Sequence, residues 1–280
     1  MSTSASTPGN ARGGARVQVR RATDDDYAAF TRLFPELQVE DPVPSREVWT
    51  ATLRPLTWIA ERAGAVVAYA YCQELEDSAY LRQIVVEPAS RRHGVARALL
   101  GQLAQHLVRR GKSAWRLNVK RENEAARRLY TELGFSVAYS TLALRLPWTA
   151  LDALPPGEAS CEEAAAERDA SLESVFGLPA RQLANARSPG RFVLVAASGS
   201  APVGLAVFDP NHPGAFPFRV LELDAAEPLL RGIRARARPS DDSTGVVIED
   251  DERLAELLMR AGATVRHDIV HLTADLPVAG

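Results

Sequence analysis

The chain has 280 residues, of which 46% are hydrophobic and 24% charged, and its formal net charge is −2. A domain with a single hydrophobic core is usually shorter than this, so the length favours two domains of about 130 residues each. The near-neutral balance gives no reason to expect a nucleic-acid-binding protein, because that function usually needs a basic face. The sequence has no run of about 18 apolar residues of the kind that predicts a membrane span.

The start of the chain, the cysteines and the histidines bear on location and metal binding. Residues 1–16 are small and polar and lack the apolar core of a signal peptide, so we expect a disordered lead-in. Cys72 and Cys161 fall in different halves and match no disulfide or zinc spacing. His267 and His271, four apart on a predicted strand, would lie about 13 Å from each other, too far to share a metal. We therefore expect a cytoplasmic protein with no metal and no membrane association.

The first half alternates between strand and helix patterns. A short strand is predicted at 17–20 and a helix at 24–33, with acidic residues in the first turn of the helix. After a proline-containing connection at 35–44, residues 46–53 favour a second helix. The order then continues with a hairpin at 58–62 and 66–73, a strand at 80–86, an amphipathic helix at 95–109, a strand at 115–119, a helix at 123–133 and one or two strands at 135–146.

The second half repeats this order after a break. Residues 148–158, which are rich in proline and glycine, are the best linker candidate. Beyond them, 202–207 resembles 66–71, and 251–262 resembles 123–134. We therefore predict a duplicated domain, with one copy at 17–147 and the other at 159–280. Chance similarity between apolar segments is the alternative interpretation.

The stretch 81–97 is the most informative part of the chain. A predicted strand ends at a proline, a short loop follows, and Gly94 stands where the next helix begins. This order directs backbone N–H groups and the positive end of the helix dipole at one point, which suits a phosphate or pyrophosphate. Arg91, Arg92 and Arg97 are basic residues at a helix start, which is unfavourable without an anion. A merely solvated basic turn is therefore the weaker interpretation.

Two motifs in this region resemble those of the GNAT N-acetyltransferases. Arg91-x-x-Gly94-x-Ala96 is similar to the acetyl-CoA loop of that superfamily, although alanine stands where glycine is commoner. Asn123-x-x-Ala126-x-x-Leu129-Tyr130-x-x-x-Gly134-Phe135 is similar to its second conserved block. The resemblance covers about 17–146. It implies an α/β fold with a mixed, mostly antiparallel sheet, in which splayed central parallel strands are flanked by helices, here duplicated in tandem.

The same resemblance implies direct transfer of an acetyl group from acetyl-CoA to an amine. The strands at 80–86 and 115–119 would splay into a cleft, and a backbone N–H near Val86 would stabilise the oxyanion by about 3 kcal/mol. Tyr130 would protonate the departing thiolate, unless it is only an aromatic packed on the inner face of its helix. Asn123 would cap its helix and also approach the pantetheine. The expected acetyl-CoA-binding residues are Ile84, Val85, Val86, Arg91, Arg92, His93, Gly94, Val95, Ala96, Arg97, Asn123 and Tyr130, with Tyr130 as the catalytic residue.

The sequence selects neither a general base nor an acceptor. Glu36, Glu40, Glu74, Glu76 and Tyr80 could each accept the proton of the amine, and no spacing distinguishes them. Small-molecule amines, antibiotics, peptide N-termini and protein lysines all remain open as acceptors. The acidic loop residues near Glu36–Asp41 hint at a cationic acceptor, but solvated loop charges explain them equally well.

The second copy lacks the features of the first. No phosphate-loop motif is present at 219–231, and Glu222, Asp224 and Glu227 would repel a diphosphate. Leu258 stands where the first copy has its tyrosine. We therefore expect the second copy to be degenerate and to have lost acetyl-CoA binding. Two alternatives to a catalytic first copy remain, a non-catalytic acyl-CoA-binding regulatory module and an acyltransferase that uses a longer acyl-CoA.

Overall fold

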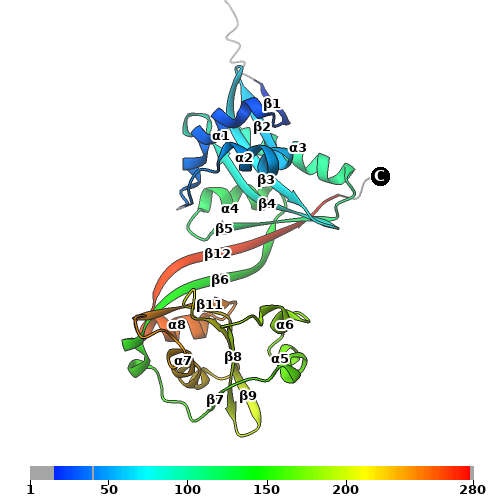
Figure 1. Cartoon of the computed structure of the whole chain (residues 1–280). Coiled ribbons are helices and arrows are strands. Elements are labelled where there is room, and N and C mark those ends of the chain that lie inside the picture. Colours follow the sequence, from blue (N-terminus) through cyan, green and yellow to red (C-terminus); the bar gives the residue numbers. More distant parts are fainter. Residues whose placement is uncertain (1–15, 40, 278–280) are drawn as a thin grey trace, which may run out of the picture. The chain divides into compact units, whose positions relative to one another are not determined.

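The computed structural model describes residues 16–39 and 41–277, which form two compact units (Figure 1). Unit 1 consists of three segments of the described chain: the residues up to Asn118, Arg128–Ser136, and the residues from Leu272 onward. Unit 2 takes Val119–Arg127 and Val137–His271. The units are thus interleaved along the chain, whereas the sequence prediction divided it once, at 148–158. All but the last residue of the expected lead-in at 1–16 lie outside the described residues.

Unit 1 is built on a sheet in which the end of the last strand follows five strands of the first half. The first four strands pair antiparallel, and the fourth and fifth pair parallel. Beside the fifth strand, the Leu276 N–H donates to the Ser113 carbonyl at 2.8 Å, which ties down the end of the last strand. In sheet order the strands are β1 (Val17–Arg21), β2 (Thr57–Arg62), β3 (Ala65–Glu74), β4 (Ser78–Val86), β5 (Ala114–Lys120) and, from Leu272, β12 (Thr264–Asp275).

The helices of unit 1 bury apolar faces against this sheet. In α1 (Tyr27–Leu33), Phe30 packs with Trp49 and with Tyr69 of β3 in one buried cluster. The long helix α3 (Val95–Arg109) contacts β1 to β4, and its buried leucines recur every fourth position, as predicted. The predicted helix at 46–53 is irregular: α2 (Arg46–Val48) continues as one π turn and then a 3-10 turn at Pro55, which has no N–H to donate.

Unit 2 has a sheet of seven strands with helices on both faces. The sheet order is β12, β6, β11, β10, β9, β8, β7, and only β10 and β11 are recorded as parallel. The strands are β6 (Ser136–Pro147), β7 (Ser160–Glu163), β8 (Phe192–Ser198), β9 (Ala201–Asp209), β10 (Gly214–Val220) and β11 (Ser243–Glu249). The region at 135–146, predicted as one or two strands, is therefore the single strand β6.

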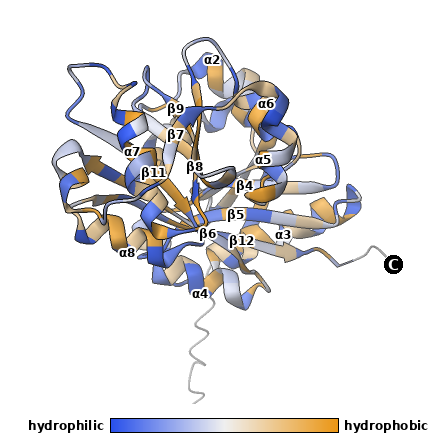
Figure 2. Cartoon of the chain, turned by 90° about the horizontal axis from the view of Figure 1, so that it is seen from below, coloured by the Kyte–Doolittle hydropathy of each residue, from blue (hydrophilic) through white to orange (hydrophobic). Residues whose placement is uncertain are grey.

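Alternation along β8 builds the two cores of unit 2. Leu194 and Ala196 face the core under α7 (Ala226–Arg234) and α8 (Glu252–Arg260), whereas Val193 and Val195 face the core under α5 (Asp169–Val175) and α6 (Gln182–Ala186). Figure 2 shows β8 and β11 mostly in hydrophobic colours, while α8 carries both kinds of residue. The sheet is therefore buried on both faces.

The predicted linker is packed rather than extended. Trp148–Ala153 forms a 3-10 helix, and Trp148, Leu151 and Leu154 are buried in the core of unit 2. Within the described residues, none of the helices is long and apolar enough to cross a membrane. The predicted α/β class, with a mostly antiparallel sheet flanked by helices and the element order repeated, is confirmed.

Candidate active site

The edge of β4 that faces β5 is open over its second half. The two strands pair in parallel from Ser78 opposite Ala114 to Leu81 opposite Leu117, and no pairing is recorded beyond this point. At the same place β4 carries a bulge, because the partners of Cys72 and Tyr71 are Leu81 and Gln83, which leaves Arg82 unpaired. A bulge bends its strand and increases the local twist. The predicted splay of the central strands is therefore present, while the bulge had no signal in the sequence.

Alternation along β4 decides which backbone groups face this open edge. The Glu87 N–H donates to the Val67 carbonyl of β3 at 2.8 Å, so Val85, two residues earlier, also directs its groups toward β3. The groups of Ile84 and Val86 then point the other way, toward the side of β5. Of the three strand residues predicted to bind pantetheine, Ile84 and Val86 are thus the two that face this edge; the Val86 carbonyl accepts from Arg91 at 3.0 Å, which leaves the Val86 N–H without a recorded partner among the described residues.

The start of α3 is open as well. Gly94 precedes the helix with φ +76°, and no side chain caps the first turn. A β-carbon added to Gly94 would meet nothing within 4 Å, so there is free space over the helix start. The N–H groups of the first turn have no partner inside a helix, and the helix dipole is positive at this end. The N–H groups of Val95, Ala96 and Arg97 can therefore receive an anion.

The basic side chains of the loop differ in how free they are. Arg91 donates to the Val86 carbonyl at 3.0 Å and pairs with Glu36 at 2.6 Å, and Arg97 pairs with Glu132. His93 turns back to the loop, with Nδ1 2.7 Å from the Arg91 carbonyl. Arg92 has φ +63° and makes no recorded side-chain contact with any described residue. Of the predicted phosphate-binding cations, Arg92 is thus unpaired, and the ion pairs of the other two were not foreseen.

Tyr130 lies on α4 (Glu124–Glu132) with its ring inside unit 1. The side chain is 4% exposed, and its ring meets Phe135 edge-on at 5.6 Å between centroids. Its hydroxyl has no hydrogen-bond partner among the described residues. Burial raises the pKa of the phenol to about 12. The residue therefore stays protonated at neutral pH, as a general acid must, and it also fills the packing role that was its alternative.

Asn123 is the N-cap of α4, as predicted. Its Oδ1 accepts the Ala126 N–H at 3.1 Å, and its carbonyl accepts the Arg127 N–H at 3.0 Å. This satisfies one of the main-chain donors that a helix start leaves free. The side chain thus has a structural task, and a contact with pantetheine remains a proposal.

Two of the side chains considered as general bases are held by cations. Glu74 Oε2 accepts from Arg110 at 3.2 Å, and its Oε1 lies 3.2 Å from His106 Nε2; burial raises the pKa of this carboxyl, but the interactions with His106 and Arg110 outweigh burial and lower it. Glu36 is paired with Arg91, as described above. Burial raises the pKa of Tyr80, so its hydroxyl stays protonated at neutral pH, which does not favour it as a general base. Glu40 lies outside the described residues, and Glu76 is the remaining carboxylate of the set.

Nucleophilic catalysis by cysteine has no support in unit 1. Cys72 is 3% exposed in β3, and burial, the largest cause, raises the pKa of its thiol to about 12. A thiol in that state forms little thiolate near neutral pH. Among the described residues, no three His, Cys, Asp or Glu side chains gather as metal ligands.

Part of this chain is similar in sequence to known proteins. The family model of the acetyltransferase (GNAT) family matches residues 21–135. The [Ribosomal protein bS18]-alanine N-acetyltransferase of Escherichia coli strain K12 is 39% identical over 85 residues, which are 30% of this chain and 57% of that protein. The chain thus spans little more than half the length of this curated relative.

Solved structures resemble the whole chain at the level of the fold. A GCN5-related N-acetyltransferase from Sphaerobacter thermophilus matches 93% of this chain and 96% of its own, with a TM-score of 0.62 and 17% identity. A tandem GNAT protein from the clavulanic acid biosynthesis pathway matches 95% of this chain and 100% of its own, with a TM-score of 0.53 and 16% identity. Together with the family match, the open edge of β4 and the open start of α3, these likenesses identify residues 21–135 as a GNAT acetyltransferase domain.

Proposed function

We propose that this chain is an acetyl-CoA-dependent N-acetyltransferase and that unit 1 binds the donor and carries the chemistry. The observation that supports this most directly is the continuity of two open features. The free edge of β4 at Ile84 and Val86 leads within eight residues to the uncapped start of α3 at Gly94. A pantetheine arm needs main-chain partners along its length, and a diphosphate needs N–H groups at its end. The two features supply these in the right order.

The residues then divide the work of the transfer. The Ile84 and Val86 backbone groups align the thioester, and the Val86 N–H donates to its carbonyl oxygen as negative charge develops there. The amine nitrogen attacks the carbonyl carbon, the carbon–sulfur bond breaks, and the Tyr130 hydroxyl gives its proton to the departing sulfur. The proton that the amine loses returns the tyrosine to its neutral form by way of solvent.

The donor's phosphates are assigned to the loop and helix start. The N–H groups of Val95, Ala96 and Arg97 face the diphosphate, and Arg92 supplies a cation that no carboxylate in the described part of the chain holds. Arg91 and Arg97 hold the loop in shape through their pairs with Glu36 and Glu132. Asn123 fixes the start of α4, from which Tyr130 extends.

The acceptor that we propose is the α-amino group of a polypeptide. The support comes from the curated relatives, which are named as alanine N-acetyltransferases of a ribosomal protein. The cytoplasm is the setting in which such acceptors and acetyl-CoA occur together. The general base remains unassigned, because Glu74 and Glu36 are committed to ion pairs.

The test is transfer of acetyl groups by the full chain across an amine panel. The panel contains peptides with free N-terminal alanine, the same peptides blocked at the N-terminus, lysine peptides, and small amines. We expect thiol release that requires a free N-terminus, with the acetyl group located on the α-nitrogen by mass spectrometry. If thiol is released only with longer acyl-CoA donors, the chain is an acyltransferase for those donors rather than for acetyl-CoA. If coenzyme A binds and no group is transferred to any amine, unit 1 is a binding module and not a catalytic domain.

A matched pair of variants tests the phosphate assignment. Arg92→Ala removes the unpaired loop cation, whereas Arg109→Ala removes an exposed cation at the other end of α3. Charge-assisted hydrogen bonds contribute about 1.5–3 kcal/mol, so Arg92→Ala should weaken acetyl-CoA binding about tenfold or more. Arg109→Ala should leave it unchanged. Equal effects of the two variants would mean that only the overall charge matters.

A further inference from the structure

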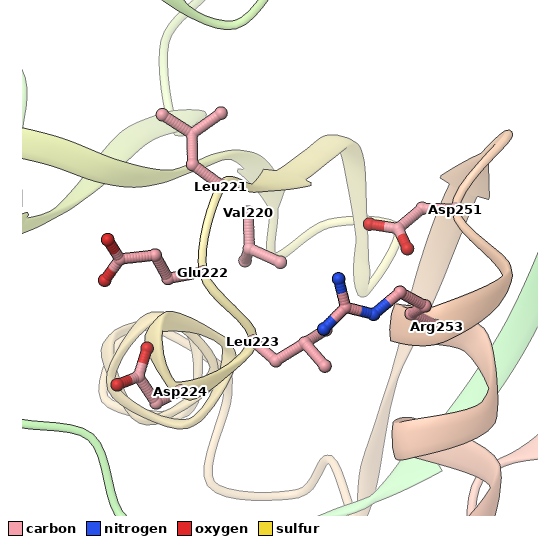
Figure 3. A pocket seen from close by; sticks show the side chains of 7 residues that line it. All are labelled: Val220, Leu221, Glu222, Leu223, Asp224, Asp251 and Arg253. Atoms are coloured by element: carbon pink, nitrogen blue, oxygen red, sulfur yellow. The ribbon is translucent and has the colours of Figure 1, made fainter.

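A cavity of about 480 Å³ lies in unit 2, at the end of β10 and the start of α8 (Figure 3). Apolar side chains and charges of both signs line it. The residues that line it are Val220, Leu221, Glu222, Leu223, Asp224, Asp251 and Arg253.

This cavity is the counterpart in unit 2 of the open edge of β4. The Leu221 N–H donates to the Val203 carbonyl of β9 at 2.8 Å, so the groups of Val220, one residue earlier, point away from β9. The recorded pairing of β10 with β11 ends at Ala215 opposite Val246, where β10 also has an irregular register with β9. Val220 thus faces the open edge of its strand, as Val86 does in unit 1.

Coenzyme A does not fit the other end of this cavity. Gly157 packs so tightly on the start of α7 that a β-carbon there would lie 2.8 Å from Pro228 Cγ and closer still to the Asp224 carbonyl oxygen. The backbone of 157 therefore covers the helix start that a diphosphate would need. In addition, Pro228 has no N–H to offer, and the carboxylate of Glu227 is buried in this first turn, where it pairs with Arg231.

The charges of the cavity come from two different elements. Arg253 extends from the start of α8 toward Val220 and Leu223 (Figure 3) and makes no recorded ion pair with the described residues. Glu222 and Asp224 come from the loop between β10 and α7 and are likewise unpaired within the described ranges. The remaining carboxylate, Asp251, already caps α8 through the Leu254 N–H at 2.9 Å. In Figure 3, Val220 and Leu223 lie between Arg253 on one side and the carboxylates of Glu222 and Asp224 on the other.

We propose that this cavity binds a small α-amino acid with an apolar side chain. Arg253 receives the carboxylate, Glu222 and Asp224 receive the ammonium, and Val220 and Leu223 contact the side chain. A ligand that carries both charges gives a partner to Arg253 and to the two carboxylates. A simple amine would leave Arg253 without a partner. The binding is independent of acetyl transfer in unit 1.

The test measures binding to the full chain by calorimetry, without acetyl-CoA. The probes are L-leucine and two analogues that each lack one charge, 3-methylbutylamine and 4-methylpentanoate. L-Leucine should bind, and each analogue should bind about tenfold more weakly, because each loses charge-assisted hydrogen bonds. Absence of L-leucine binding up to about 10 mM would overturn the proposal. So would equal affinity of the two analogues and L-leucine.

Two variants assign the charges to their partners. Arg253→Gln should weaken L-leucine about tenfold and leave 3-methylbutylamine unchanged, since that probe has no carboxylate. The double variant Glu222→Gln with Asp224→Asn should weaken L-leucine and leave 4-methylpentanoate unchanged. Glu252→Gln, which alters an exposed acid of α8 outside the lining, is the control and should change nothing. Competition between acetyl-CoA and L-leucine would instead make the cavity a coenzyme A site and refute the assignment.

Discussion

The substitution Tyr130→Phe removes a single hydroxyl from the interior of unit 1. Because that hydroxyl has no hydrogen-bond partner among the described residues, its loss should not lower the unfolding free energy at neutral pH. Turnover should nevertheless fall by about 100-fold, while the affinity for acetyl-CoA stays unchanged.

The pH dependence of the unfolding free energy gives a second, independent test of the buried position of Tyr130. Burial raises the pKa of Tyr130 to about 12, against an ordinary value of 10. The folded state thus favours the neutral phenol, so the contribution to stability is complete below pH 10 and is lost as the pH rises through 12. Two pKa units correspond to about 2.7 kcal/mol in full, of which about half, 1.4 kcal/mol, is lost at pH 11.

The assay is urea unfolding of both proteins at pH 8 and pH 11. The wild-type chain should lose about 1.4 kcal/mol more than Tyr130→Phe between the two pH values. The other buried groups that titrate at alkaline pH, Tyr69 and Cys72, are the same in both proteins, so the difference isolates one residue. Identical losses would show that the phenol is solvated when folded, and full activity of the variant would remove it from the mechanism.

Three further substitutions follow from the structure. Gly157→Ala should lower the unfolding free energy by about 1–3 kcal/mol in thermal or urea unfolding, because its β-carbon has no room; Gly245→Ala, with neighbours at 3.5 Å or more, is the control and should be nearly neutral. Gly94→Val should lower the unfolding free energy by about 1–2 kcal/mol in urea unfolding, because a φ of +76° costs about that much for a side chain with a β-carbon; Gly94→Asn, which tolerates that conformation, should lower it less. The pKa of Glu74 is lowered overall, so its stabilisation is present above pH 4.5 and is lost as the pH falls; Glu74→Gln should flatten the acid side of the stability profile, and an unchanged profile would contradict the ion-pair cluster.

Regular elements and the loop of the candidate site were predictable because they depend on local signals. The leucine spacing of α3 and the glycine before it placed the helix to the residue, and the asparagine at 123 predicted the cap that is observed. These features arise from neighbours a few positions apart in the sequence.

The features that the sequence did not reveal depend on distant partners. The bulge at Arg82 arises from the register between β3 and β4, and nothing in its own residue type requires it. The pairs of Arg91 with Glu36 and of Arg97 with Glu132 join residues 55 and 35 positions apart, so no local pattern predicts them. The packed state of 148–158 likewise depends on the core of unit 2, which buries its tryptophan and leucines in spite of the prolines nearby.

The place of the last strand has a consequence for how the protein is made. Leu272–Asp275 belong to unit 1, where Thr273 donates to the Trp115 carbonyl at 3.5 Å and Leu276 donates to Ser113. A ribosome that has finished β5 must still add more than 150 residues before these partners exist. At about 5–20 residues per second this takes on the order of ten seconds, during which one edge of β5 is unpaired. Unit 1 is thus the first to begin folding and among the last to be completed, so we expect any activity of this unit only in chains whose synthesis has reached β12.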